Sequence, residues 1–265
     1  MTSIDLDNVQ NVIVTGKSGA GKQPRIDVLA EEFDLEQLST GDIFRHYLGI
    51  FDKYDYDGDL SQFWDEEQNR FVADETIANE IGTEDNDVLL GLKAKYFVER
   101  GLFGPDYIVN ALFESKFAEK DCKNQILDGY PRTLDQAKFL LNLVSEKDVS
   151  LDFMVLVDNS DERIIQRTVQ RRICPKCGKV YHLTYKPPKN GKCEKCGVDV
   201  IQRSDDTEEK IKSRLQEFKK KALPAIEYLQ DQGIPLVNVP GHLEEFTPEN
   251  VRKSVMNEVE KLVKQ

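Results

Sequence analysis

Short apolar runs alternate with amphipathic stretches along most of this chain. The runs are continuous rather than alternating, which is typical of strands that are buried on both faces of a sheet. Five of them predict strands, at residues 11–15, 35–39, 125–129, 152–158 and 234–239. Helical spacing follows, for example at Ile26, Leu29 and Phe33. We therefore expect an α/β fold with a parallel five-stranded sheet flanked by helices.

Two segments interrupt this alternation, and we interpret them as inserts into one core. The first covers residues 46–106 and the second covers residues 173–204. The expected core is then assembled from residues 1–45, 107–172 and 205–265.

Charge distinguishes the two inserts. The 265 residues carry a net charge of −12. Residues 46–90 contain thirteen acidic residues and only two basic ones, Lys53 and Arg70, which gives a local net charge of −11. Residues 173–204, in contrast, have a local net charge of +5. An acidic chain is a poor candidate for general nucleic-acid binding.

Hydropathy excludes a membrane protein of the helical type. No apolar run approaches the roughly 18 residues of a membrane span. The first residues, MTSIDLDNVQ, lack the basic and apolar regions of a signal peptide. We expect no membrane partner and a cytoplasmic location.

The first predicted strand ends in the sequence GKSGAGKQPRID, residues 16–27. A strand, a Gly-rich turn and then a helix form the context of a phosphate-binding loop, in which backbone N–H groups and a lysine attract phosphate oxygens. Gly16, Gly21 and Lys22 fit that pattern. The Ser or Thr that should follow the lysine is absent, and Gln23 and Pro24 stand there instead.

Four of the five cysteines have the spacing of a zinc ribbon. Two C-x2-C pairs are separated by fifteen residues and comprise Cys174, Cys177, Cys193 and Cys196. Disulfides are the alternative, but a reducing compartment disfavours them. Four thiolates would fill the coordination shell, so the predicted zinc is structural. We expect Cys122 to be a small buried or half-buried thiol.

Several further segments carry a resemblance to a known family. They are LSTGDIFR (38–45), LDGYPRTLDQ (127–136), RTVQRR (167–172), RSDDTEEKIKSRL (203–215) and ALPAIEYL (222–229). Together with the loop and the cysteines, in this order, they resemble the nucleoside monophosphate kinases, most closely the adenylate kinase family. The resemblance covers almost the whole chain. It implies a P-loop NTPase-type fold and the reversible, Mg²⁺-dependent conversion of ATP and AMP to two ADP.

The resemblance also implies roles by position. The donor ATP would be bound by Gly16, Ser18, Gly19, Ala20, Gly21, Lys22, Gln23, Arg167 and Arg171. The acceptor AMP would be bound by Thr40, Arg45, Gly129, Arg132, Gln136, Arg203 and Arg214. The catalytic set would be Lys22, Arg132, Arg171, Arg203, Arg214 and Asp128, with Asp128 holding magnesium through water. Asp205 and Asp206 match an acidic pair at the hinge of the lid.

In such a kinase, residues 173–204 would form a zinc-bound lid and residues 46–106 the acceptor-binding insert. That insert is much longer here than the family pattern requires. A calcium loop placed on Gly58 fails at both ends, where Lys53 and Trp64 stand. The aromatic residues of the extra segment suggest that it packs either on the insert itself or on a second subunit, which makes residues 47–88 a candidate for self-association.

Other functions stay open at this point. One is a kinase for UMP, CMP or a broad range of acceptors. Another, from a different class, is a zinc-ribbon protein with a nucleic-acid-binding or regulatory role on a decayed kinase fold. We also expect relaxed choice of the nucleoside triphosphate, with a donor site that relies on Lys22, Arg25 and the arginines of the lid.

Overall fold

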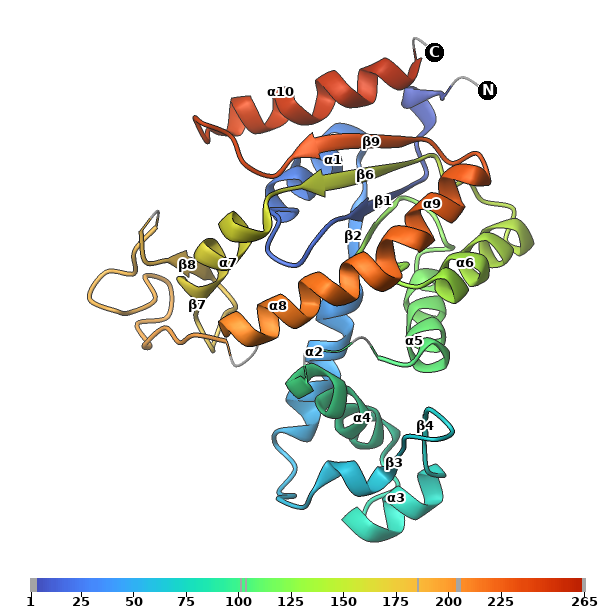
Figure 1. Ribbon diagram of the computed structural model, residues 1–265, viewed down its shortest axis with the longest axis vertical. Coiled ribbons are helices and arrows are strands. Elements are labelled where there is room, and N and C mark those ends of the chain that lie inside the picture. The colour runs from blue at the N-terminus through green and yellow to red at the C-terminus, as the bar shows by residue number, and fades with distance from the viewer. Residues whose placement is uncertain (1–3, 101, 103, 185, 204–205, 264–265) are drawn as a thin grey trace.

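The computed structural model describes residues 4–100, 102, 104–184, 186–203 and 206–263 of the chain. Figure 1 shows a core of sheet and helices with two smaller lobes, one below it from the acidic segment and one beside it from the cysteine segment. None of the helices within the described ranges has both the length and the apolar character that a membrane crossing needs.

Five parallel strands form the central sheet in the order β2–β5–β1–β6–β9. Their bounds are β1 Asn11–Thr15, β2 Glu36–Ser39, β5 Gln125–Asp128, β6 Phe153–Asp158 and β9 Leu236–Pro240. All five strands predicted from the apolar runs are therefore confirmed, as is the parallel sheet. The central strand β1 is buried along its whole length, which explains why its sequence is apolar on both faces.

Helices cover both faces of the sheet (Figure 1). Their bounds are α1 Gln23–Phe33, α5 Asp106–Ala118, α6 Leu134–Glu146, α7 Asp161–Val169, α8 Glu208–Glu217, α9 Leu223–Asp231 and α10 Pro248–Val259. Shorter turns are η1 Leu6–Asn8, η4 Glu260–Val263 and the π-helical turn η3 Phe218–Ala222 between α8 and α9.

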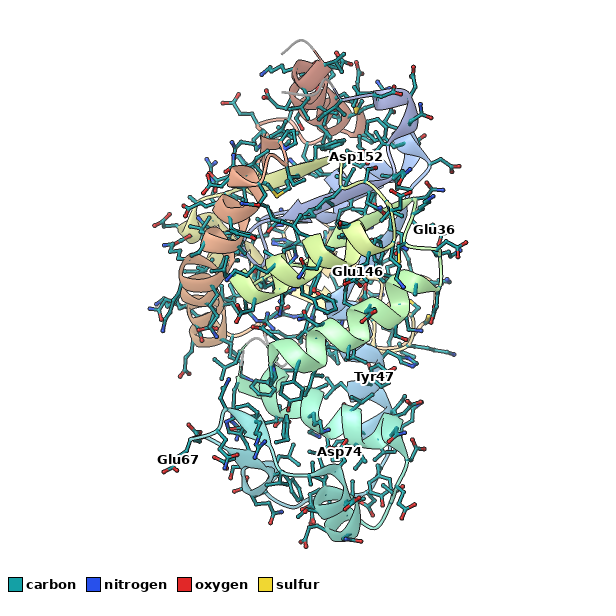
Figure 2. All side chains as sticks on the ribbon, turned by 90° about the vertical axis from the view of Figure 1, so that its right-hand side faces the viewer. Glu36, Tyr47, Glu67, Asp74, Glu146 and Asp152 are labelled. Carbon is teal, nitrogen blue, oxygen red and sulfur yellow. The ribbon has the colours of Figure 1, made fainter. Side chains whose placement is uncertain are left out.

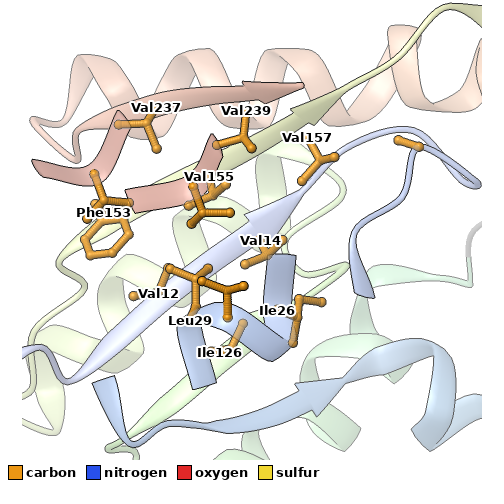
Figure 3. Packing of buried hydrophobic residues seen from close by; sticks show 14 of the residues in the cluster. Val12, Val14, Ile26, Leu29, Ile126, Phe153, Val155, Val157, Val237 and Val239 are labelled. Carbon is orange, nitrogen blue, oxygen red and sulfur yellow. The ribbon is translucent and has the colours of Figure 1, made fainter. Parts of the chain in front are cut away.

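Alternation along β1 divides the core into two layers. Val12 and Val14 pack with α1 and α10 on one face (Figure 3), and Ile13 packs with α5, α6 and α9 on the other. The two layers bury β1 fully and most of β5 and β6, so ligands can approach these strands only at their ends.

The carboxyl edge of the sheet is polar because helices begin there. Helix α6 follows β5, and α7 follows β6; their first turns are capped by Thr133 and Ser160, whose side chains accept from backbone N–H groups. The phosphate loop leaves β1 at the same edge. Helix N-termini and the loop thus meet in one place, which is a favourable site for anions.

The acidic segment folds into a lobe with its own apolar core (Figures 1 and 2). Its elements are α2 Thr40–Phe51, η2 Leu60–Phe63, β3 Trp64–Asp65, β4 Arg70–Phe71, α3 Asp74–Ile81 and α4 Asn86–Arg100. The ring of Trp64 lies 5.0 Å from those of Phe71 and Phe97. The acidic residues lie on the outside, as Figure 2 shows for Glu67.

This lobe buries many of its own aromatic side chains. Phe51, Phe63 and Phe71 are buried against residues of the same lobe, so their burial requires no second subunit. Helices α2 and α4 approach very closely at Gly91, where an added Cβ would lie 2.3 Å from the carbonyl oxygen of Tyr47. Among the described residues, no group of carboxylates comes together as a calcium site would require.

The cysteine segment forms a small lobe around β7 Arg171–Ile173 and β8 Val180–His182. Among the residues of this lobe that the structure describes, the buried core consists of Cys174, Tyr181 and Cys193, with a few half-buried neighbours. A core of this size cannot hold a fold by itself, so the lobe needs a further constraint.

Candidate functional site

The phosphate loop is shaped by glycines in close contact with neighbouring elements. Gly16 has φ +142°, and an added Cβ would lie 2.4 Å from the carbonyl oxygen of Val157. Gly19 packs in the same way on Thr168 of α7. Ser18 lies in the turn between them, and Ala20 is fully buried. The loop therefore sits tightly on β6 and α7, with α1 beginning at Gln23.

Lys22 and Asp128 face each other across the carboxyl edge. Lys22 Nζ lies 3.9 Å from Asp128 Oδ1. Burial lowers the pKa of Lys22, Asp128 opposes that shift, and Arg132, Arg171 and Arg45 add to it. Arg132 lies in the loop after β5, Arg171 at the start of β7 and Arg45 on α2, so positive charges from three segments act on this lysine. Such a cluster is unfavourable without an anion and suits a polyphosphate.

Four of the residues predicted for the acceptor lie together at the end of β5. Thr40 Oγ1 donates to the carbonyl oxygen of Gly129 at 3.0 Å, and Arg132 Nε donates to the same oxygen at 2.6 Å. Gln136 Oε1 accepts from the backbone N–H of Arg132 at 2.8 Å. The side chain of Gln136 is buried and donates to Asp106, so here its amide serves the protein's own groups.

The remaining predicted acceptor arginines come from α2, α8 and the end of the lid. Arg45 extends from α2 and pairs with Asp42 at 2.5 Å. Burial lowers the pKa of Arg132, Asp128 opposes that shift, and Arg214 and Arg45 add to it, which places Arg214 of α8 within electrostatic reach. Arg203 lies where the lid returns to the core, and its carbonyl oxygen accepts from the N–H of Asp206. Asp205 lies outside the described residues.

A cleft of about 590 Å³ separates the acidic lobe from the core. Trp64, Tyr96 and Arg100 line it on the lobe side. Asp106 and Thr133 line it on the core side, next to Gln136. The cleft has the size that small ligands occupy, but none of the predicted acceptor residues lines it, and Gln136 adjoins it only through its hydrogen bond to Asp106.

Arg25 is not where we expected it. We predicted that it would help to hold the donor phosphates. Its guanidinium is instead fully buried behind the loop, where Nη1 donates to the carbonyl oxygen of Gly21 at 3.2 Å and Nη2 to that of Pro240 at 2.6 Å. Burial, aided by Arg167, lowers the pKa of Arg25 to about 10. In this conformation Arg25 braces the loop and cannot reach a phosphate.

Arg167 and Arg171 contact different sides of the donor region. Arg167 lies against the loop, since a Cβ on Gly21 would lie 2.9 Å from its Nη1. Arg171 pairs with Asp206, which is fully buried. The structure thus brings Arg167 onto the phosphate loop and holds Arg171 at the base of the lid.

Two groups of polar contacts near the loop were not predicted, one around Asp161 and the other at Asp128. Lys17 Nζ lies 2.8 Å from Asp161 Oδ1, and Lys219 Nζ lies 2.6 Å from Asp161 Oδ2. These hydrogen bonds lower the pKa of Asp161. In the second group, Gln37 donates to Asp128 at 2.9 Å. No local pattern marks either, because each joins residues that are far apart in the sequence.

The four cysteines of the lid form one cluster. Their sulfur atoms all lie within 4.8 Å of one another, and those of Cys177 and Cys193 are 3.7 Å apart. A zinc tetrahedron with Zn–S bonds of about 2.3 Å has sulfurs about 3.8 Å apart, so this donor set fits zinc. The hydroxyl of Tyr181 donates to Cys193 and lowers its pKa to about 6. Cys122 is buried elsewhere, as predicted.

Comparisons with known proteins agree with this geometry. The family model described as adenylate kinase matches residues 82–234. The chain is similar to an adenylate kinase of Oceanobacillus iheyensis, with 36% identity over 87% of this chain and 91% of the relative. It is also similar to an adenylate kinase of Caldanaerobacter subterraneus, with 35% identity over 87% of this chain and 89% of the relative. A third relative, from Symbiobacterium thermophilum, is 34% identical over 84% of this chain and 88% of its own length.

Proposed function

The chain belongs to the adenylate kinase family, which makes it a nucleoside monophosphate kinase, and from this premise we propose the roles of its residues in moving a phosphoryl group from ATP to AMP. The observation that carries the proposal is the meeting of Lys22, Asp128 and Arg132 at the carboxyl edge of the sheet. That edge faces both lobes, as a reaction between two nucleotides requires.

On the donor side, the phosphate loop from Gly16 to Lys22 would hold the triphosphate through backbone N–H groups and the lysine ammonium. Arg167 and Arg171 would contact its phosphates as the lid folds over them. On the acceptor side, Arg45 and Arg132 would bind the phosphate of AMP, and Thr40 and Gln136 would face its adenine. Gly129 would belong to the same site. Gln136 would have to exchange its contact with Asp106 for the ligand.

Phosphoryl transfer requires little covalent chemistry from the protein. It requires two oxygens held in line and positive groups at the oxygens where charge develops. Lys22, Arg132, Arg171, Arg203 and Arg214 would supply those groups. Closure of the two lobes would exclude water, which otherwise competes as the acceptor.

Two metals belong to this proposal. Mg²⁺ bound to the nucleotide would neutralise phosphate charge. Asp128 would hold it through water, and its buried Oδ1, which has no hydrogen-bond partner among the described residues, fits that role. Zinc on Cys174, Cys177, Cys193 and Cys196 would replace the core that the lid lacks. Thiols that bind zinc stay reduced in the cytoplasm, where we place the enzyme.

The proposal is tested by turnover with each nucleoside monophosphate and triphosphate, with and without a chelator. We expect ADP formation from ATP and AMP that depends on Mg²⁺. Fast turnover with UMP or CMP but not with AMP would instead assign a pyrimidine acceptor. The mass in solution, compared with that of a chain altered within residues 47–88, tests self-association.

A further inference from the structure

Two glutamines link the start of α1 to the carboxylate of Asp128. We infer that Gln23 and Gln37 are positioning residues that fix this carboxylate for the metal–nucleotide complex. The inference rests on the proposed function, because it takes Asp128 as the carboxylate that holds the hydrated Mg²⁺. Gln23 then acts away from the phosphates, unlike its expected role as part of the phosphate loop.

The contacts form a series from the surface inward. Gln23 Nε2 donates to Gln37 Oε1 at 2.8 Å, and Gln37 Nε2 donates back to Gln23 Oε1 at 3.3 Å. Gln37 Nε2 also donates to Asp128 Oδ2 at 2.9 Å. Gln23 is exposed, Gln37 is half-buried, and the side chain of Asp128 is 15% exposed. The three residues come from α1, β2 and β5, so the series joins three elements at the carboxyl edge.

Each amide has a defined direction in this series. A carboxylate only accepts hydrogen bonds, so Gln37 must present its NH₂ group to Asp128 and not its oxygen. The reciprocal pair with Gln23 holds Gln37 in that direction. Gln23 is oriented in turn, because its Nε2 also donates to Asp27 Oδ1 at 2.9 Å. The carboxylates of Asp27 and Asp128 therefore accept hydrogen bonds at the two ends of the series and fix the orientation of the Gln23 and Gln37 amides.

The consequence is a carboxylate with one oxygen occupied and one available. Oδ2 is held by Gln37, whereas Oδ1 is buried, has no hydrogen-bond partner among the described residues and lies 3.9 Å from Lys22 Nζ. Mg²⁺ commonly keeps several waters and is held by one or two carboxylates together with phosphates. A fixed Oδ1 can accept from such a water without first losing rotational freedom.

This arrangement also explains how the loop can lack its hydroxyl. In the strict pattern, the residue after the lysine places a Ser or Thr hydroxyl on Mg²⁺. Here that residue is Gln23, and its side chain turns to Gln37. Gln23 therefore supports metal binding indirectly, because it helps to orient the carboxylate of Asp128.

The test measures ATP binding by calorimetry, without AMP, in excess Mg²⁺ and in excess EDTA. The readout is the ratio of the two dissociation constants, which is the gain in affinity that Mg²⁺ provides. Outer-shell partners typically contribute about 10–100-fold to metal affinity, so we expect Gln37→Met to reduce this gain about tenfold. Gln23→Met should reduce it less. Affinity for ATP in EDTA should stay within about twofold, which also shows that the variants fold.

Two controls make the result specific. Gln62→Met removes an exposed amide in the acidic lobe, which binds the hydroxyl of Tyr56, and should leave the Mg²⁺ gain unchanged. In an Asp128→Asn background, Gln37→Met should cause no further loss, since the glutamine acts through that carboxylate. An unchanged Mg²⁺ gain in both glutamine variants overturns the inference. If the unaltered enzyme fails to bind Mg·ATP or to form ADP, the proposed function itself fails.

Discussion

Arg171 and Asp206 meet at two points at the base of the lid. Arg171 Nε donates to Asp206 Oδ2 at 2.8 Å, and Nη2 donates to Oδ1 at 2.5 Å. Arg171 is the first residue of β7, and Asp206 lies just before α8. The pair therefore joins the two chain segments that connect the lid to the core. A two-point pair of this kind fixes direction as well as distance.

Replacement of Asp206 by Asn should destabilise the protein by about 2 kcal/mol in free energy of unfolding. Removing one partner of a fully buried pair costs more, about 3–5 kcal/mol, but the Arg171 side chain is 24% exposed and water can solvate it. Denaturant titration measures the change. Asp199→Asn, which alters an exposed pair with Lys192, serves as the control; equal losses in the two variants would contradict a special role for Asp206.

Lys22→Met should reduce kcat/KM by about 10²–10³-fold, because one preorganised charge at the reacting phosphates is lost. Steady-state kinetics with ATP and AMP measure it. Lys120→Met, which removes an exposed ion pair with Glu36, is the matched substitution and should leave kcat/KM unchanged. Activity retained in the Lys22 variant would show that this lysine is not in the catalytic set.

Cys177→Ser should abolish stoichiometric zinc binding and lower Tm. A lid in which three of the described residues form the buried core depends on the metal for its folding. A loss of about 2 kcal/mol would lower Tm by about 4–8 °C in a chain of this size. Metal analysis and calorimetry provide the measurements. Cys122→Ala should keep one zinc per chain, whereas a Cys177 variant that retains full zinc would exclude the four-thiolate site.

Gly91→Ala and Gly49→Ala should have opposite effects. At Gly91, a new methyl would press on the Tyr47 carbonyl oxygen and on Phe51, which should cost about 1–3 kcal/mol as α2 and α4 move apart. At Gly49, also helical, nothing lies within 4 Å, so alanine should stabilise by about 0.5–1 kcal/mol. Thermal unfolding distinguishes the signs. The KM for AMP should rise only in the Gly91 variant.

The donor site should accept several nucleoside triphosphates. The side chains proposed for the donor act on phosphates, which ATP, GTP, CTP and UTP share. We expect their kcat/KM values, measured with AMP as acceptor, to lie within about tenfold of one another, a spread of about 1.4 kcal/mol. A preference for ATP of a hundredfold or more would reveal a base-reading contact that the phosphate-directed residues do not provide.

The sequence predicted the sheet well because buried parallel strands have a continuous apolar signal. The Gly-rich loop indicated Lys22, and the family resemblance pointed to Asp128. The structure places the two side chains near each other at the carboxyl edge of the sheet, while their roles stay predictions. The burial of Arg25 behind the loop could not be predicted. Its position depends on the carbonyl oxygen of Pro240, which is more than 200 residues away in the sequence. The sequence does not distinguish an arginine that binds a phosphate from one that binds a backbone carbonyl group.

The acidic segment was the least predictable part. Its hairpin strands β3 and β4 have two residues each, too short for any periodicity. They are held by rings from α4, which contact Trp64 only after the lobe has folded. Composition could show that the segment was acidic outside and aromatic within, but not which surface its rings would cover.

Trp64 is the only tryptophan of the chain, and it lies where the acidic lobe borders the cleft to the core. Its fluorescence therefore reports on that lobe alone, without a label and without background from the sheet. The indole packs edge-on against Phe97 and tilted against Tyr96 and is partly open to water, so its emission should change if AMP binding moves the acidic lobe. The enzyme thus carries a built-in optical probe, which lets stopped-flow measurements separate closure of the acceptor side from the chemistry that follows.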